Sequence, residues 1–540
     1  MYSIDQNCHS LWDVIPKLEA LARRGGGLTH FVEDIDAAFT WLGASVDDTS
    51  LRLAPERFHH SGGADWGAAL FYAEFLGRLP ADPADWEPFT GMRTAALTRQ
   101  LGRSVEDLYD ELSPSDNWQL IGSSYVGDRD HHRIIGDLSV REVRPFVHEI
   151  LDRFEADMHR RFPARPSRQR LDEWLAGERA LVADLLRRHA DDRLVDLYRS
   201  WLAAYVGKTV KLAKTSDLFG LDAAGQSGLV RAFLSDYDRS SGLYNEALAE
   251  TDTKLRPLRR REGELPLFAV LDHQGHAVRT IACLRGRRLA IGQREFDLPA
   301  GGGLPVEAMR SAGVRCLAGK AVALVIQCCT DHGTSLALPY RGSLYMPAVH
   351  RVAERFAAAG LLSGPIRPIT RVRFHLLDRM KGLDTPIVLP DHLAEAFGGA
   401  EVTADRFAEG YRDISAAARA RLEAFRTAEG RDRWQRECLG ELAGRIDALD
   451  ARKRELARTA PKGEEVRALW KEVKALQTEM LDRTLRRIAA DWQLAEVDYW
   501  DSRGALLPWS IALGGREFYN RLLDRAEIYS EPLVPEEKVE

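Results

Sequence analysis

Residues 3–36 read SIDQNCHSLWDVIPKLEALARRGGGLTHFVEDID, and this stretch decides the fold. A short apolar segment precedes a polar loop, a helical pattern, a glycine turn at 25–27 and a second apolar segment at 28–32. Between the two segments, Pro16 falls near the first helical turn and apolar residues recur at helical spacing: Leu11, Val14, Ile15, Leu18, Leu21 and Ala22. The stretch predicts one βαβ unit, and we expect the rest of the chain to be built around it.

Polar loops follow both strands of this unit. The first loop contains Asp5, Gln6, Asn7, Cys8 and His9, and the second contains Glu33, Asp34, Ile35 and Asp36. In open α/β sheets ligands bind outside the carboxyl ends of the strands, so the two loops should line one crevice. The alternative is structural: Asn7 and Ser10 would cap the helix, and the acids would be solvated loop residues.

Length and composition bound the class of protein. A chain of 540 residues should hold two or three domains. The net charge of -6 gives no basic footprint for a nucleic-acid partner. An apolar run of about 18 residues is missing, as is a signal pattern, so we expect a cytoplasmic protein without a membrane partner. Six scattered cysteines without a Cys-x-x-Cys pair predict reduced thiols.

The pattern along the chain predicts three domains. Residues 1–264 should form the core with helical insertions, which are densest over 140–206. Residues 265–413 should form a small antiparallel β insert and return to the core sheet, with a buried strand at Val322–Ile326 and a helix at 347–359. Residues 414–540 should form two long helices in an antiparallel hairpin, because apolar stripes precede and follow a break at 459–463, and then one further helix.

Local motifs exclude some chemistries and leave others open. Gly207-Lys208-Thr209 resembles the end of a Walker phosphate loop, but Leu202 stands where the first glycine is required. Adjacent histidine or cysteine pairs diverge in a helix or strand, so we predict no metal site. The cluster from Asp128 to Arg133 is either a solvated turn or a general base with an orienting carboxylate. Cys8 beside His9 could be a nucleophile, although a lone cysteine is more often inert.

The order of these elements resembles the cysteine-adding enzymes of bacillithiol synthesis, the BshC family. The loop Ile4-Asp5-Gln6-Asn7 is similar to the family's Thr-Gly-Gln-Gln, and 32–36 is similar to its acidic Ser-Glu-Asp-His-Asp strand end. The resemblance covers most of the chain and is weakest over 40–130. The sequence departs from the family at Asp5, Asn7 and Ile35, and Ala323 replaces the arginine four residues before Gln327.

The resemblance implies an α/β fold with a Rossmann-like core, helical and small antiparallel β insertions, and a C-terminal coiled-coil hairpin. It implies an amide-forming ligase that joins an amino acid, cysteine in the family, to an amine of a sugar-derived acceptor. The expected catalytic residues are His9, Asp34 and His132, with either histidine as the base. The expected substrate-binding residues are Asp5, Gln6, Asn7, Glu33, Asp36, Asp130, Lys320, Gln327, Arg371 and Arg373.

Within this set, the acids 33, 34 and 36 would hold the amino acid's ammonium, and Lys320, Arg371 and Arg373 would bind its carboxylate. Amide formation needs an activated carboxylate, so we expect an adenine nucleotide, ATP or ADP, as the cofactor. The coiled coil should form a homodimer. The rival function is a non-catalytic nucleotide-binding or scaffold protein. A nucleotidyl transferase with His-x-Gly-His at the first helix ranks last, because only His9 is present.

Overall fold

A six-stranded sheet lies at the centre of this computed structural model. The structure describes residues 1–4, 11–40, 51–55, 58–59, 63–64, 71–72, 79, 83–112, 118–122, 132–253, 255–341, 345–362, 364–501 and 506–534. The central strands are β1 (Tyr2–Ile4), β2 (Leu28–Val32), β10 (Val210–Lys214), β16 (Leu336–Pro339), β17 (Ile369–Arg373) and β20 (Glu527–Glu531). They run in the order β10-β2-β1-β16-β17-β20; the first five are parallel and β20 is antiparallel to β17. The fold class is α/β.

The opening βαβ unit is confirmed. Helix α1 (Leu11–Arg23) joins β1 to β2, and β2 has the bounds that the sequence predicts. After the helix, Gly25 and Gly26 have φ values of 76° and 89°, a left-handed backbone that glycine adopts without steric cost. The three-glycine run therefore turns the chain sharply from α1 into β2, which pairs with β1 in parallel.

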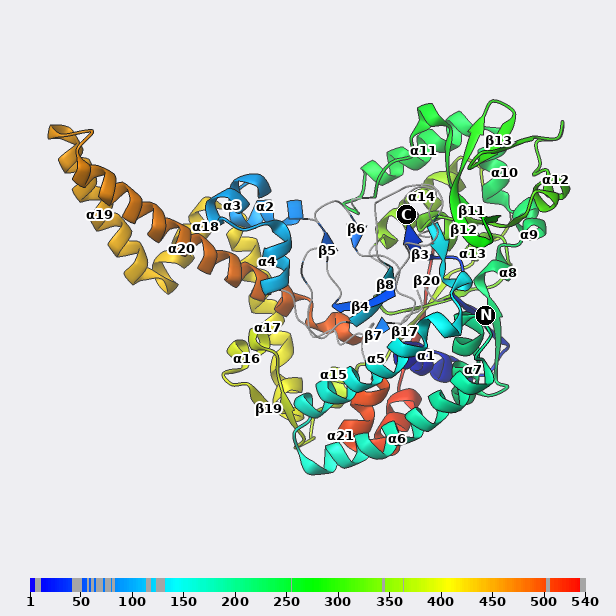
Figure 1. Cartoon of the computed structure of the whole chain (residues 1–540), viewed down its shortest axis with the longest axis horizontal. Helices are drawn as coiled ribbons and strands as arrows, with labels where there is room; N and C mark the ends of the chain where they lie inside the picture. Colours follow the sequence, from blue (N-terminus) through cyan, green and yellow to red (C-terminus); the bar gives the residue numbers. More distant parts are fainter. Residues whose placement is uncertain are drawn as a thin grey trace, which may run out of the picture.

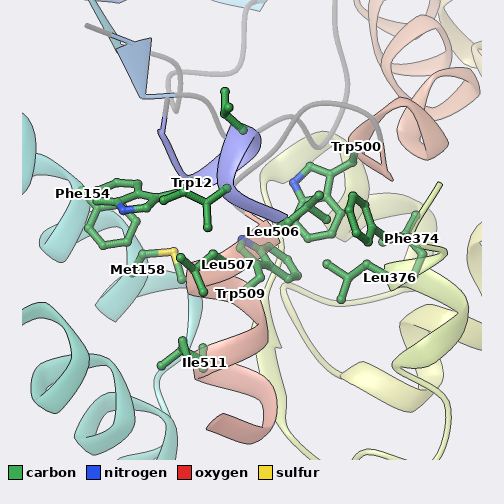
Figure 2. Close-up of a cluster of buried hydrophobic side chains, with 14 of the residues drawn as sticks. Trp12, Phe154, Met158, Phe374, Leu376, Trp500, Leu506, Leu507, Trp509 and Ile511 are labelled. Carbon is green, nitrogen blue, oxygen red and sulfur yellow. The ribbon is translucent and has the colours of Figure 1, made fainter. Parts of the chain in front are cut away.

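Two separate apolar cores cover the two faces of this sheet. Phe31 and Val32 are neighbours in β2, and their side chains point to opposite faces and belong to different clusters. The core around Val32 is formed with α1, α5 (Val140–Arg161), α6 (Arg165–Arg188), α7 (Leu194–Val206) and α21 (Leu506–Asp524). Figure 2 shows part of it, where the Trp12 and Phe154 ring centroids lie 4.4 Å apart and those of Trp500 and Trp509 lie 4.4 Å apart.

The core around Phe31 joins the sheet to several helices and a second, antiparallel sheet. The four longest of these helices are α10 (Gly228–Ser235), α11 (Tyr237–Ala249), α13 (Val322–Thr330) and α14 (Met346–Ala358). The second sheet contains β11 (Glu264–His273), β12 (His276–Arg285), β13 (Arg288–Ile291), β14 (Arg294–Asp297) and β15 (Val314–Gly319). Strand β9 (His132–Ile134) pairs with β12, and β3 (Ala37–Thr40) pairs with β9. The meander predicted from residue 265 is confirmed.

Short helices connect these strands: α8 (Thr215–Leu218), α9 (Leu221–Gln226) and α12 (Val306–Ser311). The predicted strand at Val322–Ile326 is wrong, because the segment is the first part of helix α13. Every residue of α13 is buried, so the segment lacks the one-sided period that marks a surface helix, and a short apolar run cannot be assigned by period alone.

Residues 40–115 contain more strand than the sequence predicts. The predicted helices are present as α2 (Glu87–Thr90), α3 (Thr94–Leu101) and α4 (Val105–Leu112). However, β4 (Leu51–Pro55) and β7 (Phe71–Tyr72) pair with β8 (Trp118–Gly122), and β5 (Phe58–His59) pairs with β6 (Gly63–Ala64). Such short strands give too few alternations for a period of two to be read.

The segment after β17 begins with α15 (Leu376–Arg379), β18 (Pro386–Val388), α16 (Asp391–Phe397) and β19 (Glu401–Thr403). It continues with α17 (Ala404–Phe425), α18 (Ala428–Cys438), α19 (Gly440–Thr459) and α20 (Glu464–Ala495). Figure 1 shows α19 and α20 side by side in an arm that projects from the rest of the molecule. Arg452 of α19 pairs with Glu465 of α20 at 2.6 Å. Across the described residues, no helix has the length and apolar character needed to cross a membrane.

Candidate functional site

The parallel strands place polar residues together at their carboxyl edge. Val32 lies opposite Lys214, the last residue of β10, and Pro339 lies opposite Val372 in β17. The residues that follow these positions are Glu33, Thr215, Tyr340 and Arg373. The strand order reverses beside β1, since β2 and β10 lie on one side of it and β16 and β17 on the other. Ligands of open α/β sheets bind at such a reversal.

Asp34 is a buried acid that ties β2 to the turn after β10. Its two carboxylate oxygens accept hydrogen bonds from the backbone N–H of Ser216 at 2.8 Å and from the Ser216 hydroxyl at 2.5 Å. Its own carbonyl accepts the N–H of Gly136 at 2.8 Å, where a side chain on residue 136 would meet this oxygen at 2.7 Å. Burial raises the pKa of Asp34 to about 6, although the Ser216 hydrogen bonds lower it.

Glu33 is buried next to Asp34, and its side chain folds back onto its own loop. One carboxylate oxygen accepts the N–H groups of Ile35 at 2.8 Å and Asp36 at 2.9 Å. Burial raises the pKa of Glu33 well above its usual range, and the negative charges of Asp36 and Asp34 raise it further. Asp36 is half-buried and pairs with Arg279 of β12.

These acids can do two kinds of chemistry. A carboxyl group whose pKa lies near 6 exchanges its proton close to neutral pH, which suits a general acid or base. Neighbouring buried carboxylates that repel one another also favour a cation, such as a substrate ammonium, which would relieve the repulsion. The geometry supports a structural role equally well, because Ser216 already donates a hydrogen bond to each carboxylate oxygen of Asp34.

His132 lies on the antiparallel sheet that carries the partner of Asp36. It is buried in β9, opposite Arg279 of β12 and opposite Thr40 of β3. Its neighbour Arg133 is buried in a structural network, with hydrogen bonds to Asp137 at 2.6 Å and Glu142 at 2.8 Å. The predicted cluster at 128–133 therefore supplies at least one side chain that holds the fold. His132 is connected to the acids through Arg279, which lies opposite it in the sheet and pairs with Asp36.

The predicted anion binders differ in how they are held. Lys320 donates to Glu264 at 3.0 Å, and Arg371 is buried with hydrogen bonds to Glu531 and to the Pro339 carbonyl. Arg373 instead stacks on Tyr340, with its guanidinium carbon 3.9 Å from the ring centroid. Its Nε atom is buried and has no hydrogen-bond partner among the described residues. Arg373 is thus the best-placed of these cations to bind a ligand.

The remaining predicted residues divide into two groups. Gln327 is buried in α13, where it accepts the Gly319 N–H at 2.7 Å and donates to Ser227 at 3.3 Å, so its polar atoms support the β15–α13 turn. Asp5, Gln6, Asn7, His9 and Asp130 lie outside the described residues. The predicted meeting of the first loop with Glu33, Asp34 and Asp36 therefore stays a prediction.

One group of side chains in the described part of the chain has the spacing of metal ligands. The ligand atoms of Glu155, His159 and Asp172 lie within 4.8 Å of one another on α5 and α6. However, Glu155 pairs with Arg179 at 2.6 Å and His159 with Asp172 at 2.6 Å, and the group is partly exposed. These partners complete an ordinary surface ion-pair network.

Sequence reasoning missed Ser216, Arg279 and Tyr340. Ser216 could have been found, since it lies in the Thr-Ser-Asp sequence that begins α8 directly after β10. Nothing local marks Arg279, which reaches Asp36 across 243 residues of sequence. No family model matches this chain, and no curated protein is significantly similar to it.

Proposed function

We propose that this protein is an amide-forming ligase that joins an amino acid to an amine of a small sugar-derived acceptor. Cysteine is the amino acid used by the bacillithiol-synthesis enzymes that the sequence resembles. The observation that carries the proposal is the buried pair Glu33 and Asp34 at the carboxyl edge of the parallel sheet, with raised pKa values. The proposal includes a Rossmann-like core, supported by a strand order that reverses beside β1, and a coiled-coil arm of α19 and α20.

The role proposed for each residue follows from the charge of its side chain. The carboxylates of Glu33, Asp34 and Asp36 hold the ammonium of the amino acid, and His132 or His9 removes a proton from the acceptor amine. Arg373 binds the amino acid's carboxylate, because Lys320 and Arg371 are already held by Glu264 and Glu531. Positioning both substrates at one sheet edge lowers the entropic cost of their encounter.

A nucleotide is part of this proposal because joining a free carboxylate to an amine in water is unfavourable. Tyr340 and Arg373 fit an adenine nucleotide: they lie at the reversal of strand order, and the Nε of Arg373 is buried without a partner in the described part of the chain. When bound, ATP would supply the group that activates the carboxylate. Arg373 would bind the carboxylate or its activated form, and Tyr340 would offer an aromatic surface to the nucleotide.

Mass spectrometry of reactions with ATP, cysteine and a panel of amino-sugar acceptors tests the activity. We expect a product with a new amide bond. Asp34→Asn and His132→Ala should each lower turnover by about a hundredfold. Asp297→Asn, which changes an exposed carboxylate on β14, is the matched control and should leave turnover unchanged. Nucleotide binding without any product across the panel would contradict the ligase.

The rival function is a scaffold protein that uses its arm to bind partners. Trp470 on α20 favours it, since the side chain is 53% exposed with Lys474 stacked over its ring at 5.2 Å. Under either function we propose that the arm forms a homodimer. Light scattering should show a dimer that Trp470→Glu weakens and that Lys471→Glu, an exposed neighbour, does not. A monomeric intact protein would rule the dimer out.

We also propose that the protein works in the cytoplasm. Five of its six cysteines fall among the described residues, and these five form no disulfide: Cys283, Cys316, Cys328, Cys329 and Cys438. Thiols persist in a reducing compartment, which agrees with this location.

A further inference from the structure

A cavity lies on the antiparallel sheet. Its volume is 840 Å³, and it opens between the start of α11, the loop at 259–263 and the β12–β13 hairpin. Its polar lining contains four arginines and two acids: Arg259, Arg260, Arg261, Arg285, Asp238 and Glu262. Apolar side chains complete the wall, including Ile281, Leu284 and Ala290. The cavity therefore combines a cationic rim with an apolar surface.

The two acids are matched by two of the arginines. Arg260 donates to the Asp238 carbonyl at 3.0 Å and to its carboxylate at 3.4 Å, and Arg259 pairs with Glu262 at 3.2 Å. Arg261 forms no hydrogen bond or ion pair with a described residue. Arg285 is 62% exposed and has a single long contact, 3.3 Å to Glu295. Positive charge thus remains at Arg261 and Arg285.

The loop that carries Arg261 is fixed in place before any ligand arrives. Gly263 has a φ of 72°, and a side chain there would come within 1.9 Å of the Leu284 carbonyl. The Gly263 carbonyl accepts the Leu284 N–H at 2.7 Å, which pins the loop to β12. Beneath it, the buried carboxylate of Glu264 accepts from Arg256 and Arg259. A site held in this way loses little conformational entropy on binding.

We propose that this cavity binds a phosphorylated small molecule. Arg261 and Arg285 bind the phosphate oxygens, for which the planar guanidinium has matching donor geometry. Ile281, Leu284 and Ala290 contact the body of the ligand. The site is separate from the carboxyl edge of the parallel sheet, and it does not depend on the ligase activity.

Titration calorimetry with inorganic pyrophosphate tests the phosphate site, and ADP and glucose 6-phosphate then distinguish a nucleotide from a sugar phosphate. Arg261→Ala/Arg285→Ala should weaken pyrophosphate binding by about tenfold or more, because it removes charge-assisted hydrogen bonds to the phosphate oxygens. The matched control is Arg310→Ala/Arg315→Ala, which removes two partly exposed guanidinium groups outside the cavity lining. Arg373→Ala removes the cation proposed for the other site, so any pyrophosphate binding that this variant loses belongs to that site, and the binding that Arg261→Ala/Arg285→Ala weakens should remain.

Cys283 provides a readout of where the ligand binds. Its thiol lines the cavity and is half-buried, whereas Cys438 lies on α18 and is exposed. Pyrophosphate should slow the alkylation of Cys283 by iodoacetamide and leave Cys438 unaffected, as followed by mass spectrometry of the peptides. Absence of pyrophosphate binding, equal affinity in the arginine double variant, or unprotected Cys283 would each overturn the proposal.

Discussion

Glu33 and Glu264 are both buried glutamates at the ends of strands, with 4% and 1% exposure, yet their pKa values move in opposite directions. Burial raises the pKa of Glu33, and Asp36 and Asp34 raise it further. Burial also acts to raise the pKa of Glu264, but the hydrogen bond from Arg256 and the charge of Lys320 outweigh it and hold the pKa well below its usual range.

This difference separates two uses of a buried acid. Glu264 is surrounded by Arg256, Arg259 and Lys320, so its charge is balanced and it holds the loop in place. Glu33 lies among other acids, so a cationic ligand would improve its surroundings. Burial alone therefore does not single out a candidate functional carboxylate, whereas burial among like charges does.

The largest expected effect comes from removing the charge of Glu264. Glu264→Gln leaves three cations around a neutral amide, and we expect a loss of about 3 kcal/mol in the free energy of unfolding. This is the low end for a broken buried ion pair, because the arginines are partly exposed and can be hydrated. Glu33→Gln should change stability by less than about 1 kcal/mol. Urea denaturation at pH 7 measures both losses. Equal losses would contradict the claim that Glu264 stabilises the fold more than Glu33 does.

The second prediction concerns pH. The pKa of Asp34 is about 6 in the folded protein against 3.8 for an ordinary aspartate, so the folded state binds the proton more tightly. This contribution to stability is full below about pH 4 and is lost as the pH rises through 6, a change of about 3 kcal/mol. The lowered pKa of Glu264 has the opposite effect. Its carboxylate stabilises the folded protein when the pH is above 4.5, the usual pKa of a glutamate, and this stabilisation is lost as the pH falls.

Asp34→Asn should therefore flatten the fall in stability between pH 4 and 7, since asparagine can still accept the Ser216 N–H. The free energy of unfolding measured across that range gives the slope. An exposed carboxylate, Asp297, serves for comparison, and Asp297→Asn should keep the profile of the unmodified protein. If Asp34→Asn kept the same slope, the buried acid would not be responsible for it.

A smaller effect is expected at Ser216. Its hydroxyl donates to Asp34 at 2.5 Å and lowers the pKa of that carboxyl. Ser216→Ala should destabilise the protein at pH 7 by about 1.5 kcal/mol and move the loss of stability to higher pH. Denaturation at several pH values measures both changes, and Ser235→Ala, which changes a hydroxyl bonded to α10 backbone, is the control.

The smallest effect is expected at Glu262. Its side chain is 56% exposed and pairs with Arg259 at 3.2 Å, two residues before the buried Glu264. Glu262→Gln should change the free energy of unfolding by less than about 0.5 kcal/mol, because an exposed ion pair is screened by water and salt. A loss as large as that of Glu264→Gln would show that burial is not the source of the difference.

Local pattern predicted the parts of the fold that depend on neighbours in sequence. The βαβ unit of residues 3–36 follows from helical spacing between two apolar segments, and the meander from 265 follows from alternation between glycine turns. Helix α13 was missed because all of its residues are buried, and its start is set by Ala321 at a φ of 37°, which no residue pattern encodes.

The same limit applies to the candidate site. Glu33 and Asp34 were found because they follow a strand directly. The residues around them were not predicted, because Ser216 reaches Asp34 from 182 residues away and Arg279 reaches Asp36 from 243 residues away. The cations around Glu264 include neighbours such as Arg259, yet Lys320 comes from 56 residues away. Contacts of this length depend on how the two sheets pack.

Strand β20 has a consequence for how the protein is made. It pairs with β17 and is synthesised after every other described element, so β17 has an unpaired edge while the rest of the chain emerges from the ribosome. Arg371 likewise cannot pair with Glu531 until another 160 residues have been synthesised. An unpaired strand edge is a template for association with other chains, so nascent molecules stalled before residue 527 would be the form most exposed to aggregation and most in need of a chaperone.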